Sequence, residues 1–268
     1  MKKSILLLVL SVFILYSNTS WAQKEPREVS ITGAYQRDIF DRDFNDWNQF
    51  SLSVKSDGPK YVWIPQIQLV NRFTQSDLAG QLSVYRKFKN KDYALFEMGV
   101  SQGRIMARSQ MRFIYYYTSG LWEVNTGFQY LNFPQNRFFY GPQVGLSRYI
   151  GNFLGNFTLQ YFWDIRNQWP NNYSLQHSWR YYLQGKSHLA VSASYGYDNS
   201  LVIISDQLNT PANNPYLWSV GAYFQSKFYD RSAFRLSYTF SRYQLEFFQR
   251  NQHSIQLSVE FKRNKNGK

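Results

Sequence analysis

Residues 122–164 read WEVNTGFQYLNFPQNRFFYGPQVGLSRYIGNFLGNFTLQYFWD, and they contain three runs in which apolar and polar residues alternate. An extended chain points successive side chains to opposite faces of a sheet. The first run therefore has an apolar face made of Trp122, Val124, Phe128 and Tyr130. This pattern predicts three antiparallel strands, and both a soluble β-sandwich and a membrane barrel produce it.

The composition of the chain favours the barrel. Aromatic residues make up 19% of the 268 residues, with 22 tyrosines and 22 phenylalanines, and the mean hydropathy is −0.49. Outer-membrane barrels place such an excess of aromatic residues at the two membrane interfaces. The chain has no cysteine, which excludes a disulfide framework, a thiolate metal site and a cysteine nucleophile.

The N-terminus has the pattern of a secretory signal peptide. Lys2 and Lys3 precede an apolar run over residues 5–16, and Ser20-Trp21-Ala22 follows as a cleavage site. A membrane-spanning helix needs about 20 apolar residues, which is more than this run provides, and no later segment is longer. We therefore expect residues 1–22 to be a cleaved signal peptide and residues 23–268 to form a β-barrel domain.

The rest of the chain repeats one unit: an alternating segment, a short turn, a second alternating segment and a longer polar loop. Pro65 and the pair Val70-Asn71 disturb the alternation in segment 61–73. This repetition predicts 14 strands, with 12 as the alternative. The expected strands are 28–37, 47–55, 61–73, 78–87, 93–102, 110–117, the three runs of 122–164, 173–182, 189–197, 218–225, 233–241 and 254–261.

Turn lengths along the chain alternate in the manner of outer-membrane barrels. Short turns are expected at 56–60, 88–92, 118–121, 149–153, 183–187 and 227–232. Longer loops are expected at 38–46, 103–109, 131–138, 165–172, 198–216 and 242–252. Short periplasmic turns, longer external loops and an even strand number predict a transmembrane antiparallel up-and-down β-barrel in the bacterial outer membrane, in contact with outer-membrane lipid and lipopolysaccharide. The last strand ends at Phe261, and its terminal aromatic residue is the feature that we expect the barrel assembly machinery to bind.

The polar face of the strands is expected to line the lumen. It consists mainly of Ser, Thr, Gln, Asn and Gly, and it carries few charges. The candidate lumen charges are Arg72, Arg112, Arg180, Arg235, Glu97, Glu123, Asp164 and Glu260, with Lys55 and Lys87 on the same face. An excess of positive charge would attract anions such as an anionic saccharide, whereas Arg and Glu pairs across the lumen would act as structural struts.

Motifs for catalysis are missing from the sequence. Of the three histidines, His177 and His253 are each followed by a serine, but neighbouring strand residues point to opposite faces and cannot act together directly. There is no HExxH zinc motif, phosphate-binding loop or GxSxG nucleophile motif. We therefore assign no catalytic residue, metal or cofactor, and the dispersed positive charge gives no reason to expect nucleic acid binding.

Segment 38–46 has four carboxylates and one arginine. It is interpreted either as an ordinary solvated external loop or as a site for Ca²⁺ or for divalent bridging to lipopolysaccharide phosphates.

Several segments of the chain resemble the YaiO family of outer-membrane β-barrel proteins. They are Trp122-Glu123, Gly127-Phe128-Gln129-Tyr130-Leu131, Phe133, Tyr149-Ile150-Gly151-Asn152-Phe153, Arg180-Tyr181-Tyr182 and Tyr195-Gly196-Tyr197. The resemblance extends over residues 28–261. It implies an outer-membrane barrel and no established activity.

Three functional hypotheses follow from the sequence. The first is a non-enzymatic outer-membrane barrel that acts as a narrow channel or as an accessory in envelope polysaccharide handling. The second is a barrel enzyme that acts on lipid, and the third is a soluble secreted β-sandwich that binds a ligand. Fractionation separates the third hypothesis from the other two, because a mature chain that stays soluble in the periplasm without detergent would refute the barrel. The radius of the lumen along its axis separates a pore from a plugged wall.

Overall fold

A computed structural model describes residues 28–41, 46–72, 74–134, 137–164, 172–183, 187–196, 216–229, 231–245 and 248–263. The expected signal peptide lies outside these residues. The strands are β1 (Glu28–Phe40), β2 (Trp47–Asp57), β3 (Tyr61–Arg72), β4 (Gln75–Lys87), β5 (Tyr93–Ser101), β6 (Ser109–Ser119), β7 (Trp122–Phe133), β8 (Arg137–Ile150), β9 (Phe153–Asp164), β10 (Asn172–Tyr182), β11 (His188–Gly196), β12 (Tyr216–Tyr229), β13 (Ser232–Leu245) and β14 (Phe248–Arg263).

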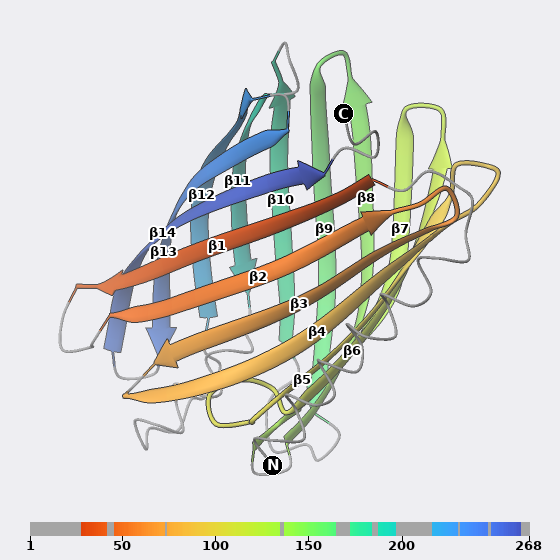
Figure 1. The fold of residues 1–268 in the computed structure, drawn as a ribbon. Coiled ribbons are helices and arrows are strands. Elements are labelled where there is room, and N and C mark those ends of the chain that lie inside the picture. Colours follow the sequence, from red (N-terminus) through yellow and green to blue (C-terminus); the bar gives the residue numbers. More distant parts are fainter. Residues whose placement is uncertain are drawn as a thin grey trace.

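These strands form one closed antiparallel barrel, in which each strand pairs with its neighbours in the chain (Figure 1). The ring closes where β1 pairs with β14, from Val29 opposite Arg263 to Phe40 opposite Gln252. The predicted up-and-down barrel of 14 strands is thus confirmed, and the alternatives of 12 strands and of a two-sheet sandwich are wrong. The described residues contain no helix that is long and apolar enough to cross a membrane.

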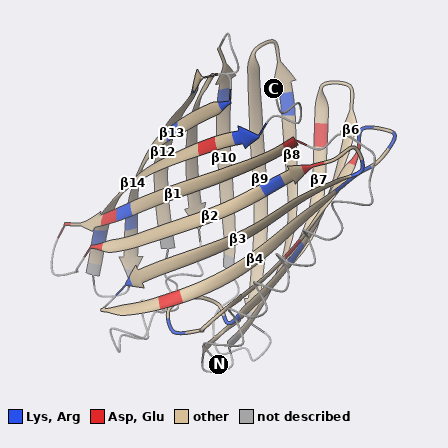
Figure 2. Cartoon of the chain, in the orientation of Figure 1, with Lys and Arg blue, Asp and Glu red and all other residues tan. Residues whose placement is uncertain are grey.

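The outer face of the barrel is apolar. On β1, Tyr35 is 48% exposed, and its cross-strand partners Phe50 and Leu257 are 51% and 49% exposed. Exposed apolar side chains of this kind recur on every strand except β4, whose outward-facing Leu78, Leu82 and Val84 are half-buried, as expected for a surface that hydrocarbon covers. Charged residues are sparse along the strands and lie mostly toward strand ends (Figure 2).

Several connections differ from the expected loops. The loop expected over 131–138 is shorter, because β7 continues to Phe133 and β8 begins at Arg137. The chain passes from β3 to β4 between Arg72 and Gln75, so β4 begins three residues before the expected position. β13 continues to Leu245, which pairs with Phe248 of β14, whereas a loop was expected over 242–252. The predicted strand stopped just before Arg242, which falls on the apolar face. In the structure its guanidinium donates to the Gln249 side chain on the neighbouring strand. A charged residue is tolerated there because the position lies near the end of the hairpin, away from the middle of the membrane.

A buried carboxylate fastens the short turn between β4 and β5. The side chain of Asp92 accepts hydrogen bonds from the Thr118 N–H at 2.9 Å, from the Tyr115 hydroxyl at 2.8 Å, and from Asn90 in the same turn. The Thr118 N–H has the largest effect, and together these donors hold the pKa of Asp92 below its ordinary value. Asp92 therefore joins the β4–β5 turn to the end of β6.

Candidate functional site in the barrel lumen

The loop between β5 and β6, residues 102–108, is organised by one carboxylate on the inner face of β4. Asp77 is fully buried. Its Oδ1 accepts the N–H of Gln102, and its Oδ2 accepts the N–H groups of Arg104, Ile105 and Met106, each at 3.0 Å. Four backbone donors around one carboxylate fix the path of the loop, because each of these bonds is charge-assisted.

The same loop packs against the inner wall of the barrel. Ile105 is fully buried, and it belongs to one apolar cluster with inward-facing residues of four strands. These residues are Val70 of β3, Leu131 and Phe133 of β7, Phe139 of β8 and Phe162 of β9, with Met106 and Ala107 packed against them. Because its partners all face inward, the loop lies inside the barrel wall and narrows the lumen at this end. Complete burial of Ile105 contributes about 1.5–3 kcal/mol to this arrangement.

The inner face of β5–β8, which we call the packed wall, is closed to solvent along much of its length. On β8, inward-facing Gln143 and Ser147 are both buried, and Asn125 of β7 is buried beside them. The Gln143 amide donates to the Asn125 carbonyl oxygen at 3.3 Å, and the Asn156 amide donates to the Ser147 hydroxyl at 2.8 Å. The polar side chains of this wall thus form hydrogen bonds with one another and with the neighbouring strand β9.

The inner face of β10–β13, which we call the open wall, is different. Gln176 of β10, Ser192 of β11 and Arg235 of β13 face inward by register, and all three are exposed. A side chain that faces inward in a closed barrel can be exposed only if the space in front of it is hollow. Other inward-facing residues of this wall, such as His188 and Tyr243, are buried. The accessible space of the lumen therefore borders the open wall in front of Gln176, Ser192 and Arg235, and the lumen is asymmetric.

Two arginines of the open wall meet at one tyrosine. The guanidinium carbon of Arg235 lies 4.7 Å from the ring centroid of Tyr223, and that of Arg180 lies 6.0 Å from the same centroid. Arg235 donates from Nε and Nη2 to the Gln225 carbonyl oxygen at 3.0 and 2.6 Å, and Arg180 donates to the Tyr182 hydroxyl at 3.3 Å. Both cations are therefore positioned by neutral groups.

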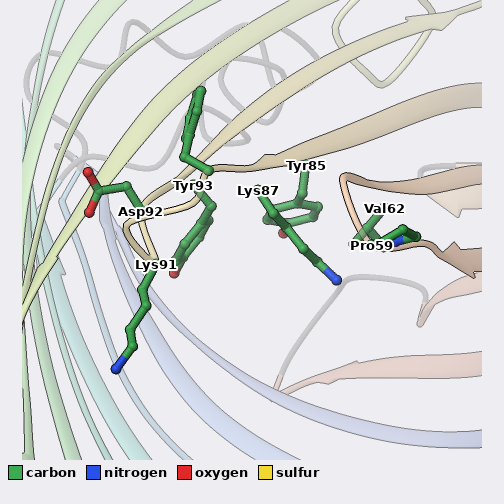
Figure 3. Close-up of a pocket in the computed structure, with 8 residues that line it drawn as sticks. Pro59, Val62, Tyr85, Lys87, Lys91, Asp92 and Tyr93 are labelled. Atoms are coloured by element: carbon green, nitrogen blue, oxygen red, sulfur yellow. The ribbon is translucent and has the colours of Figure 1, made fainter.

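A tyrosine cluster and a small cavity lie at the end of the packed wall that carries the short turn between β4 and β5. Tyr93 stacks on Tyr116 at a centroid distance of 4.2 Å, and its hydroxyl donates to Glu123 at 2.9 Å. The adjacent cavity has a volume of about 420 Å³ (Figure 3) and is lined by Pro59, Val62, Tyr85, Lys87, Phe88, Lys91, Asp92 and Tyr93. The Lys87 ammonium group is bound to Asp57 at 2.6 Å, so its charge is compensated.

The predicted lumen charges all lie on the inward register of their strands. Arg72 lies over the ring of Trp47 at 4.5 Å. Glu97 and Arg112 are cross-strand partners, and Glu97 accepts from the Ser83 hydroxyl at 3.1 Å. Glu260 lies between Thr32 and Ala233. Asp164 ends β9, and its side chain lies outside the described part of the structure.

The expected pairing of these charges across the lumen is not seen. Among the described residues, no ion pair joins Arg72, Arg112, Arg180 or Arg235 to one of the lumen glutamates. Lys55 and Lys87 instead share Asp57. None of these four arginines therefore has an ion-pair partner among the described residues, and Arg72, Arg112 and Arg180 each have a buried Nε without a hydrogen-bond partner there.

The acidic segment 38–46 does not come together as one site in the described residues. Asp38 is buried within β1, and Asp46 pairs with Arg37 on the outer face. Asp41 accepts from the Asn251 amide at 3.0 Å, and Asp43 lies outside the described residues. No group of three or more potential metal ligands occurs in the part of the chain that is described.

The histidines do not form nucleophile and base pairs with the serines that follow them. His177 packs edge-on against Trp179 on the outer face, and His253 shares a hydrogen bond of 2.7 Å with the Tyr238 hydroxyl. His188 is buried on the inner face beside Tyr182 and Tyr223.

Sequence reasoning missed Asp77, the inward loop and Tyr223. Asp77 fell just outside an expected strand. The one available signal for the loop was the set of apolar residues on the inward face, such as Val70 and Leu131, which broke the expected polar pattern.

Comparison with known proteins agrees with this architecture. The model of the YaiO membrane beta barrel domain matches residues 28–201. The CymD monoaromatic hydrocarbon channel has a TM-score of 0.61 at 8% identity, with 90% of each chain covered. A bacterial polysaccharide outer membrane secretin has a TM-score of 0.55 at 6% identity, with 90% of this chain and 100% of that chain covered. At such low identity these structures show a shared fold alone, and no curated protein sequence matches. Because the family model covers more than half of the chain and the strands close into a barrel, the chain belongs to the YaiO family of β-barrels of the bacterial outer membrane.

Proposed function

We propose that this protein is a narrow, non-enzymatic channel that carries hydrophilic solutes, in particular saccharides, across the outer membrane. The observation that carries the proposal is the asymmetry of the lumen. Inward-facing Gln176, Ser192 and Arg235 are exposed on the open wall, whereas Gln143 and Ser147 are buried on the packed wall. The open wall supplies the path, and loop 102–108 limits its width.

The chemistry of the open wall suits solutes rich in hydroxyl groups. Its inward positions carry hydroxyl and amide side chains that exchange hydrogen bonds with water or with a sugar: Ser174, Gln176, Ser178, Ser192, Ser194, Ser219, Ser237 and Thr239. Such a wall would solvate a hydrocarbon poorly. Of the two similar barrels, one is described as a hydrocarbon channel and the other as a polysaccharide secretin, and the polar wall favours the saccharide class.

A barrel enzyme acting on lipid is the second candidate, and the geometry favours it less. Lipid chemistry at the outer face would need a nucleophile and a base within hydrogen-bond reach. His253 is bound to the Tyr238 hydroxyl, and His177 lies against Trp179, so neither histidine of the outer face has a serine partner in the described structure.

The channel is tested with protein refolded from detergent into planar bilayers and liposomes. We expect discrete conductance steps, and liposome swelling rates that fall as the size of the saccharide increases. Ser192→Trp, on the open wall, should reduce the conductance. Val191→Trp places the same ring on the outer face and should leave it unchanged. Folded protein without conductance steps, and swelling no faster than in protein-free liposomes, would exclude the channel.

A further inference from the structure

The pair Arg180 and Arg235 forms a positively charged site that the channel function alone does not require. Arg180 of β10 lies in one cross-strand row with Ala190 of β11 and Tyr223 of β12. Arg235 of β13 pairs with Gln225 in the next row and covers the same tyrosine ring. Two guanidinium groups therefore converge on Tyr223 from the strands on either side of β12.

Neutral groups hold both cations in place. The Gln225 amide oxygen accepts two bonds from Arg235, and the Tyr182 hydroxyl accepts one from Arg180. A carboxylate in either place would also fix the geometry, but it would cancel the charge. No carboxylate of the described residues is within ion-pair distance of either guanidinium, and Glu260 of the neighbouring β14 is paired with neither. Neutral partners thus orient both guanidinium groups, and among the described residues none cancels their charge.

The other cations of the lumen lie in different surroundings. Lys55 and Lys87 both form ion pairs with the single carboxylate of Asp57. Arg112 lies on the packed wall with Glu97 as its direct cross-strand partner. Arg72 is stacked on Trp47, which is buried. Among these arginines and lysines, Arg180 and Arg235 alone share one aromatic ring.

We propose that Arg180 and Arg235 bind the oxyanion of an acidic saccharide, that is, a carboxylate or phosphate group carried by a sugar. Guanidinium groups bind such planar or tetrahedral oxyanions through paired N–H donors, and an unmet positive charge in a confined aqueous space strengthens the contact. Hydroxyl groups of the open wall, including Ser237 beside Tyr223, are placed to receive the rest of the sugar. The proposal rests on the channel function because the site lies on the same wall.

Equilibrium binding tests the site without requiring a continuous path. Refolded protein in detergent is titrated with D-glucuronate, with glucose 6-phosphate and with D-glucose, and binding is followed by saturation-transfer NMR. We expect at least one anionic sugar to bind about tenfold more tightly than glucose. Arg180→Gln and Arg235→Gln should each raise the Kd of that sugar about tenfold, as expected for one charge-assisted hydrogen bond. Arg112→Gln is the matched control and should leave the Kd unchanged.

The outcomes distinguish a carboxylate from a phosphate as the bound group. They also test the channel and the oxyanion site separately. Tight binding of glucuronate alone identifies a carboxylate, and tight binding of glucose 6-phosphate alone identifies a phosphate. Glucose binding as tight as that of both anions, or an Arg112→Gln effect as large as that of Arg180→Gln, overturns the site. Heat-modifiable migration on gels shows which variants fold, and Arg235, which is exposed, provides the test if Arg180→Gln does not. Conductance without anion binding refutes this inference only, and anion binding without conductance refutes the channel only.

Discussion

The carboxylate of Asp77 is stabilised by hydrogen bonds from backbone N–H groups alone, since no cation among the described residues is paired with it. Its burial would be costly without partners, and the four N–H donors of the β5–β6 loop remove that cost. One residue of β4 thus decides where a loop 25 or more residues later in the chain lies. The apolar cluster around Ile105 then fixes the loop from its other side.

Replacing this carboxylate should release the loop. We expect Asp77→Ala to lower the free energy of unfolding by about 3 kcal/mol or more, because four buried N–H groups lose their acceptor. A urea titration in lipid vesicles, followed by tryptophan fluorescence, measures the change. Asp38→Ala is the matched control, since Asp38 is also buried near a strand end but accepts, within the described part of the chain, only from Gln36, at 2.8 Å. The control should cost about 1 kcal/mol. Equal effects of the two changes would show that Asp77 does not organise the loop.

Neighbouring residues on one strand should respond to charge in opposite ways. Val191 is 54% exposed on the outer face of β11, whereas Ser192 faces the lumen. Val191→Arg should destabilise the barrel by about 2–4 kcal/mol if the site lies at the membrane midplane, as should Leu159→Arg on β9. Ser192→Arg should cost much less, because its guanidinium reaches water. Unfolding titrations in lipid vesicles that gave the same penalty at all three positions would refute the assignment of the two faces.

The strands of the barrel were predicted well by the alternation of apolar and polar residues alone. The period of two identified every strand, because one face of each strand must contact hydrocarbon along the middle of the membrane. It failed at strand ends, where this requirement is relaxed. Arg242 on the outer face and Leu131 on the inner face both broke the pattern, although both lie in continuous strands.

The apparent slip at Val70 and Asn71 has the same origin. Val70 keeps its inward register opposite Asp77 and is buried against Ile105 of the inward loop. A sequence cannot show which loop covers an inward apolar residue, because the contact is not local. For the same reason the arginines of the lumen were placed on a face from sequence, but their shared contact with Tyr223 was not foreseen.

The turn between β4 and β5 should respond to pH through Asp92. The pKa of this carboxyl is lowered from its ordinary value of 3.8, chiefly by the Thr118 N–H. A lowered pKa in the folded state adds stability that is present above pH 3.8 and is lost as the pH falls through the folded pKa. The free energy of unfolding should therefore fall more between pH 5 and pH 3 in the unmodified protein than in Asp92→Asn, as measured by urea titration.

A variant of the same turn serves as the control for Asp92. Lys91→Gln changes a neighbouring side chain without removing the carboxylate, and it should retain the pH dependence of the unmodified protein. If Asp92→Asn retained that dependence as well, the hydrogen bonds from Thr118 and Tyr115 would not contribute to the stability of the turn.

The lumen of the whole barrel is filled by side chains and a loop on one side and borders accessible space on the other. The inward loop and the packed wall occupy one part of the barrel, and the open wall borders accessible space. Closure of the sheet by β1 and β14 removes free strand edges, so this interior is bounded on all sides by the wall. The proposed channel and the proposed oxyanion site both depend on this asymmetry.

Cysteine accessibility tests the asymmetry most directly, because the chain has no cysteine of its own and every label reports an introduced residue. Single variants Gln176→Cys and Ser192→Cys probe the open wall, and Gln143→Cys and Ser147→Cys probe the packed wall. Each is refolded into liposomes and treated with a water-soluble thiol reagent that does not cross the lipid. If the lumen is asymmetric, Gln176→Cys and Ser192→Cys should be labelled rapidly. Gln143→Cys and Ser147→Cys should show little or no labelling until the protein is unfolded. Equal labelling of the two walls, or protection of both, would contradict this asymmetry.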